Sequence, residues 1–487
     1  MSNNVYPGKE EYLRLAENHD VIPVYRELLA DMETPVSVLQ RFADMPNCFL
    51  LESVEGGETW GRYSFVGVNP DLFLEADHSQ ASGRTLEALR RIYDNVRVAE
   101  LEGLPRFFGG AVGFIGYEAI SEFERVPAPR KGPEDPGPVS RFLSADSLIV
   151  FDNVRHTMKI VVCTRPDREG SAQQAYQRGI EKVSEIVGTI QSPAPERTAQ
   201  SYPPAHFESN MSREDFARIV NKAKEYIYAG DIIQAVLSQR FSARTDVPAI
   251  QLYRALRLLN PSPYMFFFKT GEHVLVGSSP EIMVRLTGSK VELRPIAGTR
   301  PRGATPQEDR KLADELLKDD KEKAEHVMLV DLGRNDIGRV AEAGSVQVPE
   351  YMVIERYSHV MHLVSHVQGI LRKRLDAYDV IGATFPAGTL TGAPKIRAME
   401  IINELEPGTR GAYGGAMGYV GYNGNMDMAI TIRTLDISPG SVSVQAGAGI
   451  VYDSVPEREF DETCHKARGM QKAVQMAVGG LEVPGGP

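Results

Sequence analysis

Two pairs of glutamates in the second half of the chain have the spacing of neighbours on one face of a helix. Glu322 and Glu325 are three residues apart, as are Glu459 and Glu462, and both pairs lie in stretches that we expect to be helical. Taken alone, the first pair is better explained as a solvated acidic face, and the second as part of an ordinary Glu–Lys surface pair. Together, two such helices could hold one Mg²⁺, which typically takes one or two protein carboxylates and leaves positions for an anionic ligand and water.

Three glycine-rich segments could present backbone N–H groups to a carboxylate. They span residues 295–300, 387–395 and 445–450, and we expect them to be turns beside strands or a helix start. None is a phosphate-binding loop, because the pattern GxxxxGK[ST] is absent. Taken singly, each segment is also explained as a purely structural turn.

Three single side chains could act in such a site. Glu281 follows a strand and could be a general acid, His362 lies in an apolar stretch, and Arg433 alternates with apolar neighbours in an expected strand. The alternatives are a surface carboxylate, a core histidine and a structural ion pair.

Composition limits the partners that such a site could serve. The 487 residues include 54 Lys and Arg and 65 Asp and Glu, so the formal net charge is −11. This balance argues against nucleic acid or an anionic membrane as a partner, since both select basic patches. No apolar run approaches the roughly 18 residues of a membrane span, and residues 1–10 resemble no signal peptide. The cysteines Cys48, Cys163 and Cys464 form no CxxC pair, so we expect a cytoplasmic protein without disulfides.

The elements that must position these residues fall into two parts. A polar, proline-containing stretch at 190–206 predicts a linker between residues 1–195 and 207–478. The second part opens with a helix that Ser212 can cap, followed by a strand at 231–241 and hairpin-like runs up to about residue 293. Because helices and strand runs lack a steady βαβ alternation, the pattern favours the α+β class.

One segment is repeated. Residues 109–117 match residues 414–422 at six of nine positions, and both alternate glycine with aromatic or β-branched residues. This pattern predicts strands that another backbone approaches closely. Either the two halves share a structural unit, or the match is a coincidence of glycine-rich strands.

Taken in order along the chain, these motifs resemble those of the chorismate-utilising enzyme family, most closely its anthranilate-forming branch. The resemblance covers residues 207–478 at motif level and the N-terminal region more loosely. It implies two interlocked α/β parts with packed, mostly antiparallel β-sheets flanked by helices. Residues 1–195 would be a regulatory domain, and residues 207–478 the chorismate-binding catalytic domain.

The resemblance also implies a cofactor and a role for each candidate. Mg²⁺ would be held by Glu325 and Glu462, with Glu322 and Glu459 behind them. Glu281 would protonate the departing 4-hydroxyl group, and His362 would lie beside the ring and assist pyruvate elimination. Further residues implied to bind the substrate are Gly298, Thr299 (also implied to be catalytic), Thr389, Tyr413, Arg433, Gly447, Ala448, Gly449 and Lys466.

Two positions separate the branches of the family. Isochorismate and salicylate synthases carry a water-activating lysine where this chain has Gln234, and aminodeoxychorismate synthases carry a nucleophilic lysine where it has Ala297. Neither residue can take that role. What remains is attack by ammonia, giving anthranilate and pyruvate by way of 2-amino-2-deoxyisochorismate. The alternatives are a phenazine-type enzyme that stops at this intermediate and a non-catalytic chorismate-binding subunit.

Partners are implied as well. No cysteine lies in the GxCxG elbow of a class I glutamine amidotransferase, so ammonia would come from a separate amidotransferase subunit in a heterodimer or heterotetramer. Relatives of the tryptophan pathway bind tryptophan, their feedback inhibitor, through segments that resemble residues 50–53 and 260–265. The implied inhibitor contacts are Ser53, Pro263, Tyr264 and Met265; the alternative is that both segments are core pieces.

Overall fold

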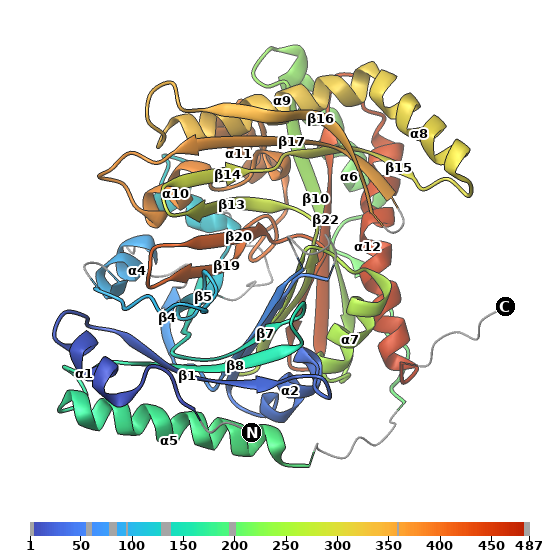
Figure 1. Ribbon diagram of the computed structural model, residues 1–487. Helices are drawn as coiled ribbons and strands as arrows, with labels where there is room; N and C mark the ends of the chain where they lie inside the picture. Colours follow the sequence, from blue (N-terminus) through green and yellow to red (C-terminus); the bar gives the residue numbers. More distant parts are fainter. Residues whose placement is uncertain are drawn as a thin grey trace.

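The computed structural model describes residues 4–54, 61–76, 85–93, 96–127, 138–193, 201–357 and 360–481, apart from the side chain of Ile92. Two large sheets form its centre, and every pairing between named strands in them is antiparallel (Figure 1). Side chains from both sheets meet in one buried cluster, in which Phe114 of one sheet packs edge-on against Phe268 of the other. The expected α+β fold with packed antiparallel sheets is confirmed.

The first sheet combines early and late strands. Its order is β1-β8-β7-β3-β2-β11-β12-β21-β22-β10-β18, and β9 also pairs with β10. Its strands are β1 (Ile22–Leu29), β2 (Asn47–Glu52), β3 (Tyr63–Val68), β7 (Ser147–Asp152), β8 (Thr157–Thr164), β9 (Glu208–Ser209), β10 (Gln234–Arg244), β11 (Tyr264–Thr270), β12 (His273–Ser279), β18 (Gly392–Ala393), β21 (Thr434–Ser438) and β22 (Ser441–Ile450).

The second sheet also combines strands from early and late parts of the chain. Its order is β15-β17-β14-β13-β20-β19-β5-β6-β4, and β16 also pairs with β17. Its strands are β4 (Leu72–Ala76), β5 (Gly110–Ile115), β6 (Ser140–Ser144), β13 (Ile282–Thr287), β14 (Lys290–Leu293), β15 (Ile296–Pro301), β16 (Gln347–Arg356), β17 (Val360–Ile370), β19 (Ala416–Gly421) and β20 (Met426–Ile430).

The repeated segments join the two halves of the chain. They form β5 and β19, which pair side by side with Gly113 opposite Gly418. A Cβ added at Gly113 would lie 2.1 Å from the carbonyl oxygen of Arg141, and one added at Gly418 would lie 2.0 Å from that of Asp427. The expected close approach of another backbone is therefore present at both glycines.

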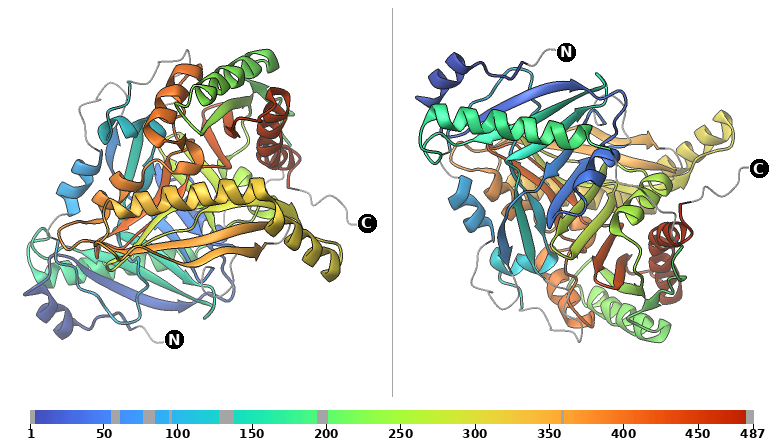
Figure 2. Two further views of the ribbon diagram at one scale, coloured as in Figure 1. Left: turned by 90° about the horizontal axis from the view of Figure 1, so that it is seen from above. Right: turned by 90° about the horizontal axis from the view of Figure 1, so that it is seen from below.

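Helices cover the outer faces of the sheets. Seen from below, α5 crosses the first sheet over β1 and β8 (Figure 2), while α12 packs on β22, α6 and α7. The helices are α1 (Lys9–Ala16), α2 (Pro35–Phe42), α4 (Thr85–Tyr93), η2 (Tyr117–Glu122), α5 (Ala172–Gln191), α6 (Arg213–Tyr228), α7 (Ala249–Leu259), α8 (Pro306–Lys318), α9 (Asp320–Gly338), α10 (Ala377–Thr384), η3 (Gly388–Leu390), α11 (Lys395–Leu405) and α12 (Pro456–Val478).

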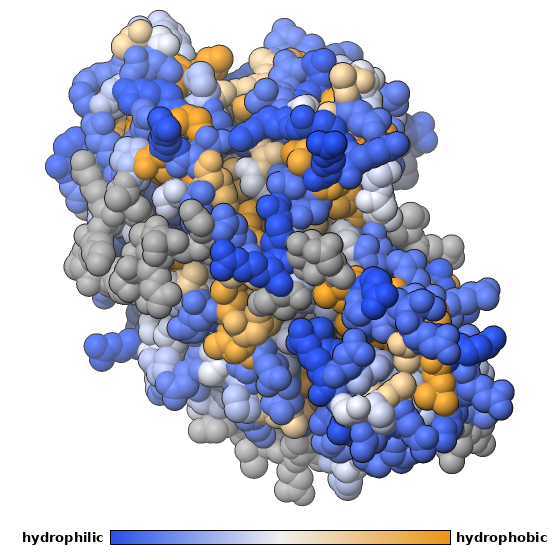
Figure 3. Space-filling view, turned by 90° about the vertical axis from the view of Figure 1, so that its left-hand side faces the viewer, coloured by the Kyte–Doolittle hydropathy of each residue, from blue (hydrophilic) through white to orange (hydrophobic). Residues whose placement is uncertain are grey.

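The face of the molecule shown in Figure 3 is largely hydrophilic. On this face, hydrophobic residues gather in small, scattered patches. Within the described residues, no helix combines the length and apolar character needed to cross a bilayer.

Several local expectations differ from the structure. Residues 295–300 and 445–450 are not turns, because most of their residues belong to β15 and β22. Arg433 does not lie in a strand; it precedes β21 with a left-handed φ of 48°. Ser212 caps α6 as expected, accepting a hydrogen bond from the Asp215 N–H. The division at the linker stays a prediction, and residues 194–200 of that stretch lie outside the described residues.

Candidate active site

A cavity of about 1330 Å³ opens between α9, α12, β10, β22 and the loops at the ends of the second sheet. It collects the predicted catalytic, substrate-binding and metal-binding residues with one exception, Ala448. That side chain is fully buried on the other face of β22, in a cluster with Phe216 and Leu237. The predicted residues that line the cavity are Gln234, Glu281, Ala297, Gly298, Thr299, Glu322, Glu325, His362, Thr389, Tyr413, Arg433, Gly447, Gly449, Glu459, Glu462 and Lys466.

The paired glutamates reach this cavity from two helices. Asp319 caps α9 by accepting hydrogen bonds from backbone N–H groups, including that of Glu322, and Pro456 occupies the first turn of α12. Burial raises the pKa of Glu325, and the charges of Glu322 and Glu462 raise it further. Carboxylates from α9 and α12 thus face one another across the cavity.

This arrangement fits Mg²⁺. Within the described residues no group of three or more His, Cys, Asp or Glu side chains gathers as a ready-made metal site. Two carboxylates, here Glu325 and Glu462, are the usual protein contribution to a Mg²⁺ site that a substrate and water complete. The mutual repulsion that raises the pKa of Glu325 is what a divalent cation would relieve.

Cationic and glycine residues line the cavity beside the glutamates of α12. The Lys466 Nζ lies 2.7 Å from Glu462 Oε1 and donates to the Gly447 carbonyl oxygen at 2.9 Å. A Cβ at Gly447 would lie 2.7 Å from the Tyr413 hydroxyl, and one at Gly449 would lie 2.3 Å from Gln234 Nε2. Glycine at these two positions therefore lets the side chains of Tyr413 and Gln234 approach the backbone of β22 closely.

Glu281 is placed to hold a proton. It lies in the short connection between β12 and β13, and burial raises the pKa of its carboxyl group to about 8. The neighbouring Thr389 side chain and the charge of Arg433 lower that pKa in part. The group is therefore largely protonated at neutral pH, as a general acid must be.

His362 stands beside the strand that carries Gly298 and Thr299. Its Nδ1 lies 2.9 Å from the Gly298 carbonyl oxygen and 3.1 Å from the Thr299 hydroxyl. Burial lowers the pKa of the imidazole. Gly298 bulges from β15 with a φ of 61°, which glycine adopts without strain.

The sequence alone missed residues in the cavity and next to it. Arg300 bridges Glu322 at 3.3 Å and Asp319 at 2.8 Å, and so links β15 to the start of α9. Lys395 lines the wall and pairs with the buried Asp336 at 2.7 Å. Neither contact joins residues at helical or strand spacing, so no periodicity could have pointed to it.

Comparison with known proteins agrees with this geometry. A family model described as "chorismate binding enzyme" matches residues 46–472. The chain belongs to this family. The anthranilate synthase component 1 of Acetivibrio thermocellus is 47% identical, covering 97% of this chain and 99% of its own, and that of Pseudomonas putida is 48% identical over 96% and 99%.

Two solved structures share the fold. Component I of anthranilate synthase from Streptococcus pneumoniae superposes with a TM-score of 0.76 and 39% identity, covering 84% of this chain and 92% of its own. The menaquinone-specific isochorismate synthase of Escherichia coli has a TM-score of 0.70 at 20% identity, covering 96% and 98%, which shows the fold alone. The family and the fold inferred from the motifs are confirmed.

In this chorismate-binding chain, the two segments predicted to bind tryptophan lie together outside the catalytic cavity. Strand β2 pairs with β11, so that Glu52 lies opposite Met265, and the Val54 N–H donates to the Ser262 carbonyl oxygen at 3.2 Å. Ser53, Pro263, Tyr264 and Met265 are thus neighbours at one junction. Their role in binding an inhibitor stays a prediction.

Proposed function

We propose that this chain is the chorismate-converting subunit of an anthranilate synthase, a Mg²⁺-dependent lyase that forms anthranilate and pyruvate from chorismate and ammonia. The observation that carries the proposal is the single cavity that combines a protonated carboxyl group, cationic side chains and two converging carboxylates. The near full-length similarity to anthranilate synthase component 1 supports it.

The first step needs a proton, because hydroxide is a poor leaving group. Glu281 donates it to the 4-hydroxyl group of the substrate, which departs as water while ammonia bonds to C2. The product of this step is 2-amino-2-deoxyisochorismate.

Two carboxylates of the substrate need partners. Lys466, Arg433 and the backbone at Gly447 receive the enolpyruvyl carboxylate, while Glu325 and Glu462 would hold Mg²⁺ for the ring carboxylate. When bound, the metal ion neutralises that carboxylate and orients the ring.

The second step removes pyruvate and a ring proton, which leaves the aromatic product. His362 lies beside the ring position defined by Gly298 and Thr299. Its Nδ1–H is engaged by a carbonyl oxygen, so Nε2 is the atom that can accept a proton.

The nucleophile is ammonia because the chain lacks the groups that would favour another. Gln234 cannot deprotonate water, and Ala297 cannot form an adduct with the ring. None of the three cysteines has the surroundings of a glutaminase nucleophile, and burial raises the pKa of each thiol. A separate amidotransferase subunit therefore supplies the ammonia. Tryptophan inhibits the enzyme by binding at the β2–β11 junction.

One assay tests the proposal and its alternatives. The purified chain is incubated with chorismate, Mg²⁺ and either ammonium or glutamine, and products are followed by anthranilate fluorescence and mass. We expect anthranilate with ammonium and none with glutamine. An amino intermediate without pyruvate would identify the phenazine-type enzyme. No reaction would identify a non-catalytic subunit, and turnover with glutamine would contradict the need for a partner.

A further inference from the structure

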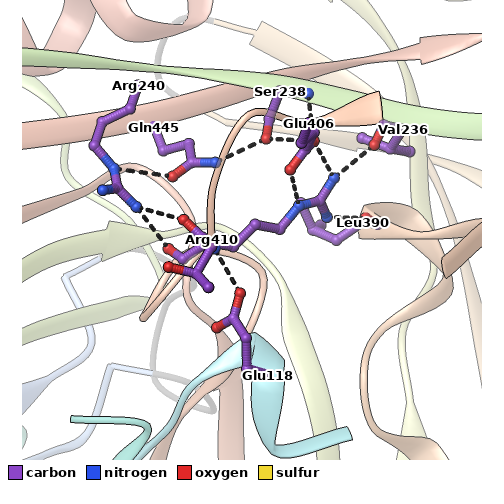
Figure 4. Close-up of polar contacts among 9 residues, drawn as sticks. Glu118, Val236, Ser238, Arg240, Leu390, Glu406, Arg410 and Gln445 are labelled. Atoms are coloured by element: carbon purple, nitrogen blue, oxygen red, sulfur yellow. Dashed lines mark hydrogen bonds and ion pairs between the residues drawn. The ribbon is translucent and has the colours of Figure 1, made fainter. Parts of the chain in front are cut away.

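A buried ion pair lies directly behind the catalytic cavity. Arg410 and Glu406 lie in the segment between α11 and β19, and their side chains are 1% and 4% exposed. The guanidinium group donates to both carboxylate oxygens, with Nη2–Oε1 at 2.6 Å and Nε–Oε2 at 2.9 Å (Figure 4). Such a bidentate pair has one well-defined geometry.

The remaining bonds of Arg410 reach two walls of the cavity. Its Nη2 also donates to the Val236 carbonyl oxygen at 2.7 Å, and its Nη1 donates to the Leu390 carbonyl oxygen at 2.8 Å (Figure 4). Both Val236 and Leu390 line the cavity, and Leu390 follows Thr389, which lines the cavity together with Glu281. One side chain therefore joins β10 to the η3 turn.

Arg410 also contacts a third wall of the cavity through aromatic rings, and hydrogen bonds of its own backbone hold the segment in place. The guanidinium carbon lies 4.5 Å from the ring centroid of Tyr117 and 5.6 Å from that of Tyr413, whose hydroxyl lies under Gly447. The backbone N–H groups of Arg410 and Gly411 donate to the Glu118 carboxylate at 2.5 and 3.0 Å. The segment is therefore anchored to the N-terminal half of the chain.

Glu406 extends the network towards β22. It accepts hydrogen bonds at 2.8 Å from the backbone N–H and from the hydroxyl of Ser238, which is opposite Gly447 in the sheet. Gln445, a further residue of the cavity, donates to the Ser238 hydroxyl at 2.8 Å.

We propose that Arg410 is a positioning residue of the active site, which acts through Leu390 and Tyr413 to hold Thr389 against Glu281 and the Tyr413 hydroxyl beneath Gly447. Arg410 itself touches no reacting atom. The proposal rests on the proposed function, because its consequences are read in the conversion of chorismate. Lysine keeps the charge but offers a single nitrogen, and it cannot reproduce a planar fork with acceptors on three sides.

The test compares Arg410→Lys with Arg41→Lys. Arg41 lies in α2, is 10% exposed and pairs with Glu33 at 3.0 Å, and it does not line the cavity. Rates of anthranilate formation from chorismate and ammonium are measured between pH 6 and 10. For Arg410→Lys we expect kcat/KM to fall roughly ten- to a hundredfold, with Arg41→Lys within about twofold of the wild type.

The alkaline limb of the pH profile is the fall in kcat/KM as Glu281 loses its proton. A shift of this limb distinguishes a positioning role of Arg410 from a general loss of folded structure. The neighbouring Thr389 side chain lowers the pKa of Glu281, and Arg433 is the charged group that acts on this carboxyl. If Arg410 holds Thr389 in place, Arg410→Lys moves the limb to higher pH and Thr389→Val moves it equally. The double variant then shows no further shift, because both changes remove the same interaction.

The outcomes are distinct. A folded Arg410→Lys protein with the wild-type limb and kcat/KM, or additive shifts in the double variant, overturns the proposal. If Arg410→Lys does not fold, Glu406→Gln, which removes one acceptor of the fork, is expected to shift the limb in the same direction. Failure of both to fold, with Arg41→Lys folded, assigns the pair to fold stability instead. A wild-type chain that makes no anthranilate overturns the proposed function itself, and this proposal with it.

Discussion

The Nδ1 atom of His362 lies 2.9 Å from the carbonyl oxygen of Gly298. A carbonyl oxygen can only accept, so the ring proton is on Nδ1 and the lone pair is on Nε2. Burial lowers the pKa of this imidazole, so the ring is neutral at neutral pH. One backbone contact therefore sets both the orientation and the tautomer of the side chain that we place beside the substrate ring.

Replacement of His362 by glutamine tests that role. We expect kcat to fall roughly a hundred- to a thousandfold, the usual range for loss of a proton-transfer group, while the alkaline limb set by Glu281 stays in place. His366→Gln is the control, because His366 is on the same strand and pairs with Glu292 at 3.0 Å without lining the cavity. Equal activity of the two variants would exclude a catalytic His362.

Replacement of Glu281 by glutamine removes the proposed acid and keeps its shape. We expect a loss of roughly 10²–10⁴-fold in kcat at pH 7. In the wild type, kcat/KM should fall as pH rises through about 8, because the active form is protonated. A Glu281→Gln protein with substantial activity would show that another group donates the proton.

The same carboxyl group makes a stability prediction. Its pKa is about 8 in the folded chain and near 4.5 when unfolded, so its stabilising contribution is present below the unfolded pKa and is lost as pH rises through the folded one. The free energy of unfolding of the wild type should fall relative to that of Glu281→Gln by about 1.4 kcal/mol per pH unit between these values. Denaturant unfolding at pH 5, 6.5 and 8 measures this difference.

Metal binding can be tested without turnover. We expect Glu325→Gln and Glu462→Gln each to weaken the binding of Mn²⁺, a spectroscopic substitute for Mg²⁺, by roughly tenfold or more, since each removes one of two ligands. Glu457→Gln is the control, because Glu457 is exposed in the first turn of the same helix and does not line the cavity. Calorimetric titration of the apoprotein gives the affinities, and unchanged binding in both ligand variants would contradict the site.

The glycine surface of β22 predicts a steric effect. A Cβ at Gly447 would lie 2.7 Å from the Tyr413 hydroxyl and 2.9 Å from the Leu237 carbonyl oxygen, so we expect Gly447→Ala to raise KM for chorismate at least about tenfold. Gly188→Ala in α5 meets nothing within 4 Å and should stabilise the helix by roughly 0.5–1 kcal/mol without altering KM. An unchanged KM in Gly447→Ala would remove this surface from the binding site.

The β2–β11 junction predicts a loss of regulation. We expect Ser53→Phe to abolish inhibition by tryptophan, because a bulky ring there would fill the space between residues that the structure brings together. The measurement is the ratio of ammonium-dependent rates with and without tryptophan. Inhibition that persists in Ser53→Phe would place the effector elsewhere.

Local signals in the sequence predicted much of the site. The i, i+3 spacing placed Glu322 with Glu325 and Glu459 with Glu462, and all four line the cavity. The position of Glu281 at the end of an expected strand also pointed to this residue, which lines the cavity. These succeed because helix and strand geometry relates residues that are near in sequence.

Contacts between distant residues were beyond such reasoning. Arg410 bonds to Val236 and to Leu390, 174 and 20 residues away, and nothing in its sequence neighbourhood marks it. Arg433 was expected in a strand, but its backbone adopts a left-handed conformation. Its carbonyl oxygen accepts a hydrogen bond from the Ser278 N–H at 3.1 Å. Tertiary contacts, which local patterns do not encode, decide both positions.

The pairing of β5 with β19 has a consequence for synthesis of the chain. Ile115 pairs with Ala416, so the ribosome must add 416 − 115 = 301 residues before this edge can close. At about 5–20 residues per second, the apolar strand Gly110–Ile115 waits roughly 15–60 s for its neighbour. During that time an unpaired strand edge is exposed to other nascent chains. A fold whose halves share their sheets thus keeps one strand edge open until most of the chain has been made.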